Sequence, residues 1–266
     1  MTAEGTAGLG SPALWILDLD GVVWLAGTPI GDVGGAVGAL RASGAAVAFV
    51  TNNSSPTIDA LRRRLAGVGI DASPDELATS ARVAASMLEP GQSVTVLAEH
   101  GVLEALEERQ VNVVDDGGPA GDAAVVGWCR NFDFAALTRI STAARESGRL
   151  IATNGDPTHP TPDGLVPGSG ALLAAVATAS GVVPEIAGKP HLPMVRYLHT
   201  HLGIEQGANA VLVGDQPGTD GLLAQQLGIG FALVDSGVTP PGAPTGDCPV
   251  AVRSPDLVSL VAEVLG

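Results

Sequence analysis

Residues 14–21 read LWILDLDG and join a short apolar run to two acidic residues and a glycine. A run this short, bounded by polar residues, is typical of a buried β-strand. Asp18 and Asp20 stand two positions apart, so both carboxylates would point to one side of an extended strand, and Gly21 permits a sharp turn directly afterwards. An isolated acidic pair more often only terminates a strand, so its meaning depends on the rest of the chain.

Three more apolar runs share this length and also end at polar residues; they are 45–50, 210–213 and 230–234. A Ser-Pro pair precedes several helical patterns, at 55–56, 73–74 and 254–255. A Ser cap followed by Pro at the first helical position is a common helix start, so we expect a helix after each pair, the second over 75–88. The alternation predicts an α/β fold with a doubly wound, mostly parallel sheet.

A second α/β series occupies the middle of the chain. We expect strands near 94–98, 111–114, 123–127 and 150–153, and helices near 101–109 and 134–147. Because polar motifs flank this series at both ends, we interpret 82–186 as a domain inserted into a core formed by 1–81 and 187–266. The stretch 239–248, TPPGAPTGDC, predicts a surface loop.

The composition indicates a folded protein and excludes several classes. Hydrophobic residues make up 45% of the 266 residues and charged residues 15%, unlike a disordered chain. With 28 acidic against 13 basic side chains the formal net charge is −15, so we expect no nucleic-acid partner. The apolar runs are far shorter than the roughly 20 residues that cross a bilayer, and residues 1–10 do not resemble a secretory signal. We therefore expect no membrane contact and a cytoplasmic location.

Polar residues follow the predicted core strands, at the edge where doubly wound sheets bind ligands. The second core strand leads into Thr51-Asn52-Asn53-Ser54-Ser55, directly before a predicted helix. Hydroxyl and amide groups at a helix N-terminus can bind phosphate oxygens. Plain helix capping is an equally good explanation for this run taken alone.

Two further motifs carry charge. Lys189, in Gly188-Lys189-Pro190, is the only lysine, since the other twelve basic residues are Arg. A lysine kept in such a chain indicates a need for a compact ammonium, although one leftover lysine is an ordinary alternative. The segment 213–221, VGDQPGTDG, follows another predicted strand and holds Asp215 and Asp220. Carboxylates of this kind, with phosphate and water, suit Mg²⁺.

Together these motifs resemble the haloacid dehalogenase-like superfamily of phosphohydrolases. The match is to DxDG at 18–21, Thr51, Lys189 and GDxxxTD at 214–220. The TNNSS run, the long insertion and ATNGDPTHPTPDGLVPGSG at 152–170 resemble its subclass IIA, the p-nitrophenylphosphatase-like enzymes. The resemblance runs from about residue 14 to residue 234. It implies a Rossmann-like core, an inserted α/β cap that closes over the site, and hydrolysis of a small phosphorylated metabolite.

The resemblance also implies a role for each acidic residue. Asp18 would attack phosphorus and become an aspartyl-phosphate. Asp20 would protonate the leaving group and then activate water. Mg²⁺ would be held by Asp18, the backbone carbonyl of Asp20 and Asp215, with Asp220 orienting these ligands.

Other residues would bind the substrate. Thr51, the backbone of Asn52 and Lys189 would hold the transferring phosphoryl oxygens. In the cap, Asn154 and Asp156 match family positions near the entrance, although ordinary turn chemistry explains them equally well. The subclass also implies a homodimer that pairs through the caps.

Three alternatives stay open at this stage, of which a catalytically inactive binding protein is disfavoured because every residue that the chemistry needs is present. The motifs do not separate hydrolysis from phosphoryl transfer to another acceptor, as in a phosphomutase of the same superfamily. A receiver-like signalling domain also places acidic residues, a Thr and a Lys at the strand ends, but it needs only about 120 residues and no cap. Two positions depart from the family pattern: Gln216 stands where Arg is more usual, and Gly221 replaces an apolar residue.

Three features outside the motifs have ordinary explanations. Trp24, just after Gly21, fits either the wall of the site or the core. The run 62–64, RRR, favours a solvated helix face with local ion pairs. His199 and His201 lie two apart on a predicted helix and make a poor metal pair.

Overall fold

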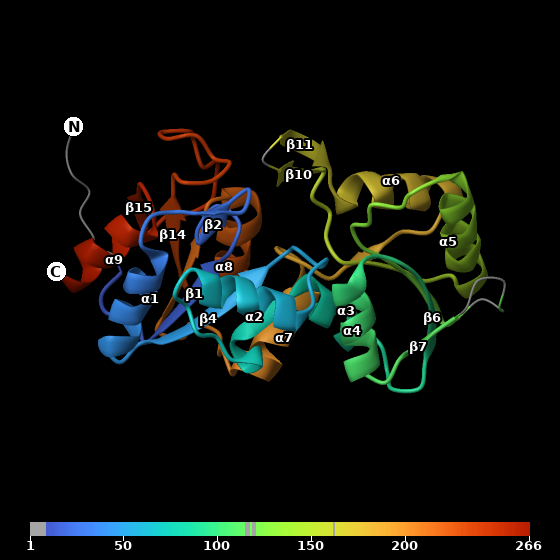
Figure 1. Ribbon diagram of the computed structural model, residues 1–266, viewed down its shortest axis with the longest axis horizontal. Helices are drawn as coiled ribbons and strands as arrows, with labels where there is room; N and C mark the ends of the chain where they lie inside the picture. Colours follow the sequence, from blue (N-terminus) through green and yellow to red (C-terminus); the bar gives the residue numbers. More distant parts are fainter. Residues whose placement is uncertain (1–8, 115–117, 119–120, 162) are drawn as a thin grey trace. The chain divides into compact units, whose positions relative to one another are not determined.

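The structure is a computed structural model that describes residues 9–114, 118, 121–161 and 163–266 (Figure 1). The chain divides into two compact units. The first comprises Met1–Thr51, Leu61–Ala78 and Leu198–Gly266, and the second Asn52–Ala60 and Thr79–Tyr197. The insertion that the sequence predicts at 82–186 lies within the second unit. Both units are built on parallel sheets, so the predicted α/β class is confirmed.

The first unit contains a six-stranded sheet in the order β15-β14-β13-β1-β4-β5. Its strands are β1 (Leu14–Asp18), β4 (Ala46–Thr51), β5 (Leu77–Thr79), β13 (Ala210–Gly214), β14 (Gly230–Val234) and β15 (Val252–Ser254). β1 runs parallel to both β4 and β13. Along the chain, β4 and β5 are added on one side of β1, and β13, β14 and β15 are added later on the other side. This reversal makes the carboxyl ends of β1 and β13 the expected ligand site.

The central strand is buried on both faces, as in other parallel sheets. Trp15, Ile16 and Leu17 are all nearly inaccessible to solvent. α1 (Val33–Ala42) turns Val33, Ala36, Val37 and Leu40 inward, which is the spacing of one helix face. α1 packs against α9 (Leu257–Leu265), and α8 (Leu222–Leu227) packs against β14.

Two helices begin later than the Ser-Pro pairs predict. α2 (Ile58–Gly67) is capped by Thr57, whose Oγ1 accepts the backbone N–H of Ala60 at 3.2 Å. α9 is capped by Asp256, whose carboxylate accepts the N–H of Ser259 at 2.7 Å. The Ser caps predicted at 55 and 254 are therefore wrong, because the residue after each proline is itself a strong capping residue. Ser73, by contrast, is an N-cap followed by Pro at the first position, as predicted.

The prediction of one helix over 75–88 is also wrong. The segment forms a 3₁₀ turn (Pro74–Glu76), then β5, then α3 (Ser80–Ser86). All residues of β5 are buried at the edge of the core sheet, and Thr79 then caps α3 by accepting the N–H of Arg82 at 3.2 Å. Pairing with the sheet outweighs the local helical pattern here. A short window of sequence does not contain the strands with which the segment pairs.

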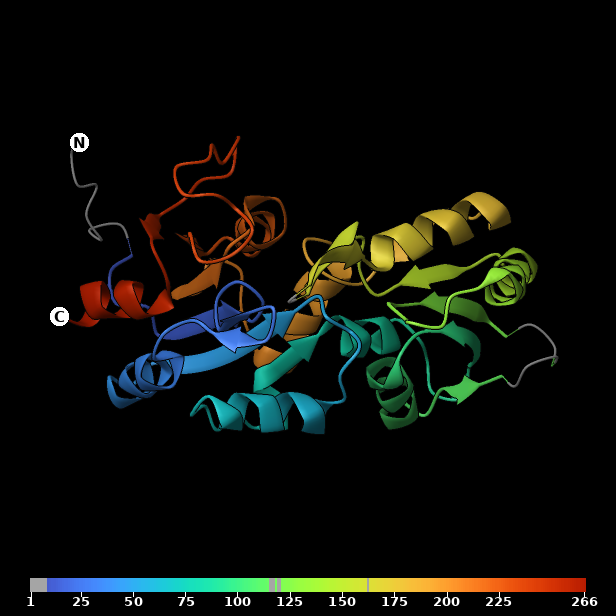
Figure 2. The same ribbon diagram turned by 45° about the horizontal axis from the view of Figure 1, so that its top comes forward.

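The second unit contains a five-stranded sheet in the order β12-β9-β8-β6-β7. Its strands are β6 (Ser93–Leu97), β7 (Asn112–Val113), β8 (Ala123–Val126), β9 (Leu150–Ala152) and β12 (Glu185–Ile186). Its helices are α4 (His100–Glu108), α5 (Phe134–Ser147) and α6 (Ser169–Ser180). Figure 2 shows α5 and α6 on one face of this sheet and α4 on the other.

The remaining elements are two hairpins and one helix. β2 (Trp24–Leu25) pairs with β3 (Thr28–Pro29), and β10 (Thr158–Thr161) pairs with β11 (Gly164–Pro167). α7 covers Leu192–Leu202. The stretch 239–248 has neither helix nor strand, as predicted. Within the described part of the chain, no helix has the length and apolar character needed to span a membrane.

Substituting Ile16 tests the role of the central strand. Its side chain is fully buried, so Ile16→Ala should lower the free energy of unfolding by about 2–5 kcal/mol. Urea denaturation followed by circular dichroism measures this loss. Leu265→Ala, at a residue of α9 that is 44% exposed, is the control and should change stability little. Equal losses in both variants would contradict the assignment of β1 as the core strand.

Candidate active site

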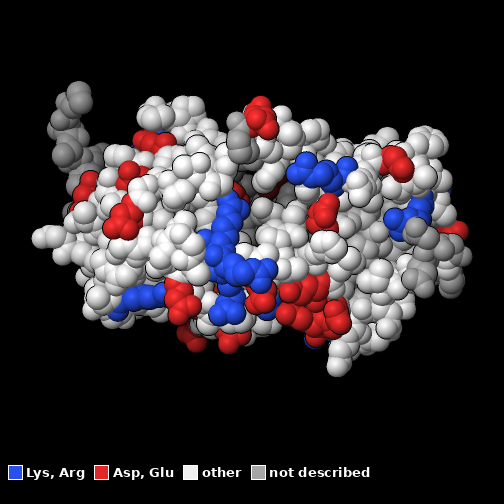
Figure 3. All heavy atoms as spheres, in the orientation of Figure 1, with Lys and Arg blue, Asp and Glu red and all other residues white. Residues whose placement is uncertain are grey.

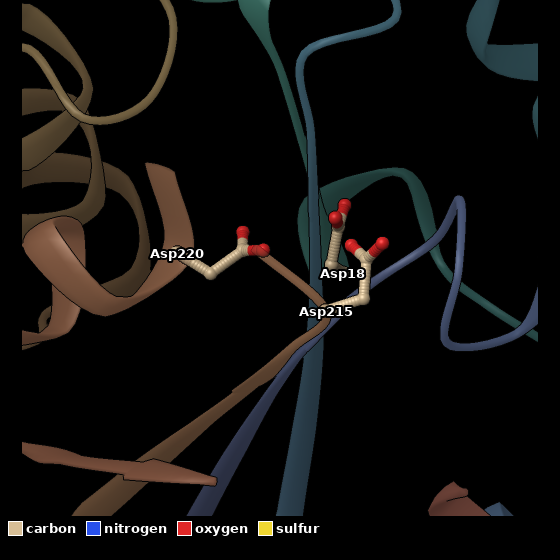
Figure 4. Close-up of side chains that lie close together, drawn as sticks. All are labelled: Asp18, Asp215 and Asp220. Atoms are coloured by element: carbon tan, nitrogen blue, oxygen red, sulfur yellow. The ribbon is translucent and has the colours of Figure 1, made fainter. Parts of the chain in front are cut away.

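Three carboxylates meet at the carboxyl ends of β1 and β13. Asp18 ends β1, Asp215 follows β13 directly, and Asp220 lies in the π-helical turn Pro217–Gly221. Each offers an oxygen within 4.8 Å of those of the other two (Figure 4). Figure 4 shows the Asp18 and Asp215 carboxylates pointing the same way, with Asp220 reaching toward them from the neighbouring turn.

All three side chains are buried, with 5% or less of their surface exposed. Buried like charges at this separation repel one another strongly unless a cation or protons compensate them. A set of carboxylate oxygens is the donor set that hard divalent cations prefer. The cluster therefore fits a divalent metal ion.

Backbone N–H groups orient each carboxylate. Leu19 donates to Asp18 Oδ1 at 2.7 Å, and Val238 donates to Asp215 Oδ2 at 2.6 Å. The N–H of Gln216 donates to Asp220 Oδ2 at 3.1 Å. Hydrogen bonds to an ionised acceptor are short and strong, so they hold the oxygens in place. The departure at Gln216 leaves this bond intact, because it comes from the backbone.

Glycines leave room for the carboxylate of Asp215. A Cβ on Gly21, which has φ +89°, would lie 2.5 Å from Asp215 Cγ. A Cβ on Gly237 would collide with Asp215 Oδ2. Sequence reasoning did not single out Gly237, because nothing in its local sequence shows that the loop after β14 approaches Asp215.

Close packing also explains the departure at Gly221. A Cβ there would collide with Sγ of Cys248 and lie 3.1 Å from the ring of Phe231. Cys248 is a buried free thiol, and burial, together with the nearby charge of Asp220, raises its pKa. An apolar side chain at 221 would therefore displace the segment that carries Asp220.

Asp20 lies in a tight loop between β1 and β2. The N–H of Gly21 donates to the carbonyl of Trp24 at 2.7 Å, and the N–H of Trp24 donates to the carbonyl of Leu19 at 3.1 Å. Trp24 is only 1% exposed, and its Nε1 donates to Asp20 Oδ1 at 3.0 Å. Trp24 thus belongs to the core and also binds a predicted site residue.

The expectation of a solvated face at 62–64 is wrong for two of the three arginines. Nε of Arg62 donates to the carbonyl of Ala72 at 2.8 Å, and the guanidinium of Arg64 lies 3.9 Å from the centroid of the Trp24 ring. Arg63 is exposed, as expected. Long arginine side chains can pack their stems against apolar surface while binding through their heads, which helical position alone does not predict.

Asn52 and Lys189 form one arrangement in the second unit. Asn52 Oδ1 accepts the backbone N–H of Lys189 at 2.7 Å, and its Nδ2 donates to the Lys189 carbonyl at 3.2 Å. A Cβ on Gly188 would collide with Asn52 Oδ1, so glycine permits this approach. Lys189 is 3% exposed. The loop that carries the only lysine is therefore held by the side chain of Asn52.

The predicted cap residues bind Asn52 as well. Nδ2 of Asn154 donates to the Asn52 carbonyl at 2.7 Å, and Asp156 accepts from Asn52 Nδ2 at 3.1 Å. The hydroxyl of Ser80 donates to the same carbonyl at 2.7 Å. Sequence reasoning missed Ser80, since a single serine in a helical pattern carries no signal.

The structure thus divides the predicted residues into two groups. The first unit holds Asp18, Asp20, Thr51, Asp215 and Asp220, and Thr51 is buried at the end of β4. The second unit holds the other four, which are Asn52, Lys189, Asn154 and Asp156.

The two histidines of α7 stay outside the site. His201 Nδ1 lies 2.9 Å from the hydroxyl of Thr200, and among the described residues neither histidine joins a cluster of metal ligands. Figure 3 shows basic side chains in a few short runs and acidic side chains in small spots and one larger group, with most of the face uncharged.

An acidic cluster at the switch point of a parallel sheet, with a second α/β unit inserted in the chain, is typical of one class of hydrolase. The chain belongs to the haloacid dehalogenase-like hydrolase family, whose model matches residues 15–112; a related HAD-hydrolase-like model matches residues 186–259. The resemblance that the motifs carry is therefore confirmed.

Two relatives of this chain are named as enzymes that act on phosphorylated compounds. Over 228 residues the chain is 32% identical to the 5'-nucleotidase YutF of Bacillus subtilis, a match that covers 85% of this chain and 88% of that protein. It is 31% identical to an acid sugar phosphatase of Staphylococcus aureus, over 85% of this chain and 87% of the relative.

Solved structures agree with these matches. The p-nitrophenyl phosphatase from Archaeoglobus fulgidus is similar with a TM-score of 0.85 and 28% identity, over 94% of this chain and 98% of that one. Glycerol phosphate phosphatase Rv1692 from Mycobacterium tuberculosis, in complex with magnesium, is similar with a TM-score of 0.82 and 28% identity, over 94% and 76%. The chain is a phosphoric monoester hydrolase of the p-nitrophenylphosphatase-like subclass, and the receiver-like alternative has no support.

Gly237→Ala tests whether the glycine is needed to leave room for the carboxylate of Asp215. The new methyl group should displace the Asp215 carboxylate and lower kcat/KM for p-nitrophenyl phosphate by about 100-fold or more, because small displacements of reacting groups are costly. Steady-state phosphate release measures this. Gly218→Ala is the matched control, since a Cβ there meets no atom within 4 Å. The same loss in both variants would contradict the role assigned to Gly237.

Proposed function

We propose that this chain is a Mg²⁺-dependent phosphatase that hydrolyses a small phosphate monoester through an aspartyl-phosphate on Asp18. The observation that carries the proposal is the cluster of Asp18, Asp215 and Asp220, which sets a carboxylate nucleophile among groups that fit a divalent metal. The relatives support the substrate class, because they are named a 5'-nucleotidase, an acid sugar phosphatase and a glycerol phosphate phosphatase.

The metal site is assigned to residues of the first unit. Asp18, Asp215 and the backbone carbonyl of Asp20 would hold Mg²⁺, and Asp220 would orient these ligands. The bound ion would supply positive charge to the oxygens of the phosphoryl group. Mg²⁺ is favoured over softer metals because every assigned donor is an oxygen. The magnesium and calcium complexes of the glycerol phosphate phosphatase support a hard divalent ion.

The reaction proceeds in two steps at Asp18. A carboxylate oxygen of Asp18 forms a bond to phosphorus while the ester P–O bond breaks and its electron pair stays on the leaving oxygen. The carboxyl of Asp20 gives its proton to that oxygen. In the second step Asp20 removes a proton from water, the water oxygen attacks phosphorus, and the aspartyl P–O bond breaks to release inorganic phosphate and restore Asp18.

Three groups would hold the phosphoryl oxygens. These are the hydroxyl of Thr51, the backbone N–H of Asn52 and the ammonium of Lys189. A buried ammonium stabilises developing negative charge far better than one in water does. The bonds from Asn52 to the Lys189 backbone support this assignment, because they fix the loop that carries the ammonium.

The insertion completes the proposal. Residues 82–186 would form the cap that excludes bulk water and contacts the leaving group, and 1–81 with 187–266 would form the catalytic core. Asn154 and Asp156, bound to Asn52 in this structure, would lie near the entrance. We further propose a cytoplasmic location, on the sequence argument given above, and pairing through the caps, which the resemblance implies. Fractionation tests the location and light scattering tests the pairing.

Asp18→Asn should abolish phosphate release, because an amide is a poor nucleophile and a neutral, weaker metal ligand. The assay measures inorganic phosphate from a panel of sugar, glycerol and nucleoside monophosphates, with Mg²⁺ or with EDTA. We expect turnover by the native chain in Mg²⁺ alone, and a loss of at least about 1,000-fold in the variant.

The same assay separates hydrolysis from transfer. Intact-mass analysis of the native chain shows whether phosphate stays on Asp18, and added alcohols show whether another acceptor takes it. Phosphate retained without release, or passed only to an alcohol, would overturn the hydrolase mechanism in favour of a phosphotransferase.

Lys189→Arg should not preserve activity, although it keeps the positive charge. Asn52 fixes the backbone of Lys189 and the side chain is buried, so a larger planar head should misplace its charge and lower kcat/KM by about 100-fold. Kinetics with the best substrate of the panel measures this. Arg63→Lys, at an exposed residue, is the reverse exchange and serves as the control. Native activity in the Lys189→Arg variant would contradict the need for a compact ammonium.

A further inference from the structure

We infer that Trp24 is a positioning residue for the acid–base carboxyl of Asp20: its indole N–H holds Oδ1, which presents Oδ2 for proton transfer, and Arg64 packs on the face of the indole ring. This inference rests on the proposed role of Asp20. It concerns residues of the first unit only.

The donor is rigid. Trp24 Nε1 lies 3.0 Å from Asp20 Oδ1, and the side chain is 1% exposed. Its backbone is held on both sides, by the bonds to Leu19 and Gly21 that close the loop. An indole can donate a hydrogen bond but cannot accept one, so it cannot exchange protons with the carboxyl. Asp20 itself is only partly buried, and a fixed donor therefore limits which way its carboxyl group faces.

Arg64 packs on the face of the indole ring. Its guanidinium carbon lies 3.9 Å from the centroid of the Trp24 ring, within the range of a cation–π contact. The buried side chains of Leu61 and Leu65 anchor this face of α2. Burial lowers the pKa of Arg64, while the negative charge of Asp20 opposes that shift. An arginine stays protonated under these conditions, and a cation on the ring face polarises the indole toward a stronger N–H donor.

This arrangement matters most for poor leaving groups. An alkoxide needs a proton as it departs, whereas p-nitrophenolate is stable enough to leave without one. A correctly oriented Asp20 carboxyl should therefore accelerate cleavage of alkyl phosphates more than cleavage of p-nitrophenyl phosphate. A purely structural role for Trp24 would affect both substrates equally.

Trp24→Phe removes the N–H and keeps an aromatic ring. The test compares kcat/KM for p-nitrophenyl phosphate with kcat/KM for the alkyl phosphate that the native chain cleaves fastest. For each substrate, kcat/KM reports the steps up to formation of the aspartyl-phosphate, even where a later step limits kcat. We expect kcat/KM to fall about tenfold or more for the alkyl phosphate and at most about threefold for p-nitrophenyl phosphate. An unchanged ratio would overturn the inference.

Trp15→Phe is the matched control. It makes the same exchange at another buried tryptophan of the same unit, and it should change both substrates equally. A ratio shifted as much by Trp15→Phe would also overturn the inference, because the shift would then reflect general loosening of the core.

Asp20→Asn separates the inference from the proposed function. If this variant discriminates against the alkyl phosphate and Trp24→Phe does not, the inference alone fails. If Asp20→Asn shows no discrimination, the proposed acid–base role of Asp20 fails. Should Trp24→Phe unfold at the assay temperature, Arg64→Gln decides instead, because it keeps the indole and removes the cation. A shift of the ratio in the same direction supports the inference, and an unchanged ratio overturns it.

Discussion

Electrostatic repulsion among three buried carboxylates is the constraint on which the rest of this site depends. Asp18, Asp215 and Asp220 offer oxygens within 4.8 Å of one another in a place that water hardly reaches. Such an arrangement persists only if fixed dipoles, together with a cation or bound protons, compensate the charges. Backbone N–H groups donate a hydrogen bond to each carboxylate and so supply such dipoles. Glycines leave the space that the carboxylate of Asp215 occupies. The parallel sheet supplies the rigid strand ends that make this arrangement possible.

A second polar arrangement, in the other unit, positions charge of the opposite sign. Asn52 binds both backbone groups of Lys189, which lies 137 residues further along the chain. The lysine is thus positioned through its backbone, so its ammonium is not needed to hold the loop in place. Asn154, Asp156 and Ser80 all bind the same asparagine. Substitution of Asn52 would therefore disturb several segments at once, which sets it apart from an ordinary helix-capping residue.

Two errors in the sequence-based description share one physical cause. The segment 75–88 has a helical pattern, yet its buried residues Leu77–Thr79 gain more by pairing at the edge of the core sheet. The run 62–64 has the pattern of a solvated face, yet Arg64 lies against Trp24 because the loop after β1 presents an aromatic ring there. In both cases the deciding partner is distant in sequence. Local propensity describes the chain well only where no such partner competes.

The sequence by itself determined the α/β class, the strands that carry the motifs and the family, but it left hydrolysis and phosphoryl transfer unseparated. It could determine the first three because strands, turns and motif spacing are local and because the motif residues have few other uses in combination. Only the tertiary structure decided that Gly237 borders Asp215, that Trp24 binds Asp20 and that Asn52 holds Lys189. These relations depend on distances between segments far apart in the chain, which arise when the sheets pair and pack.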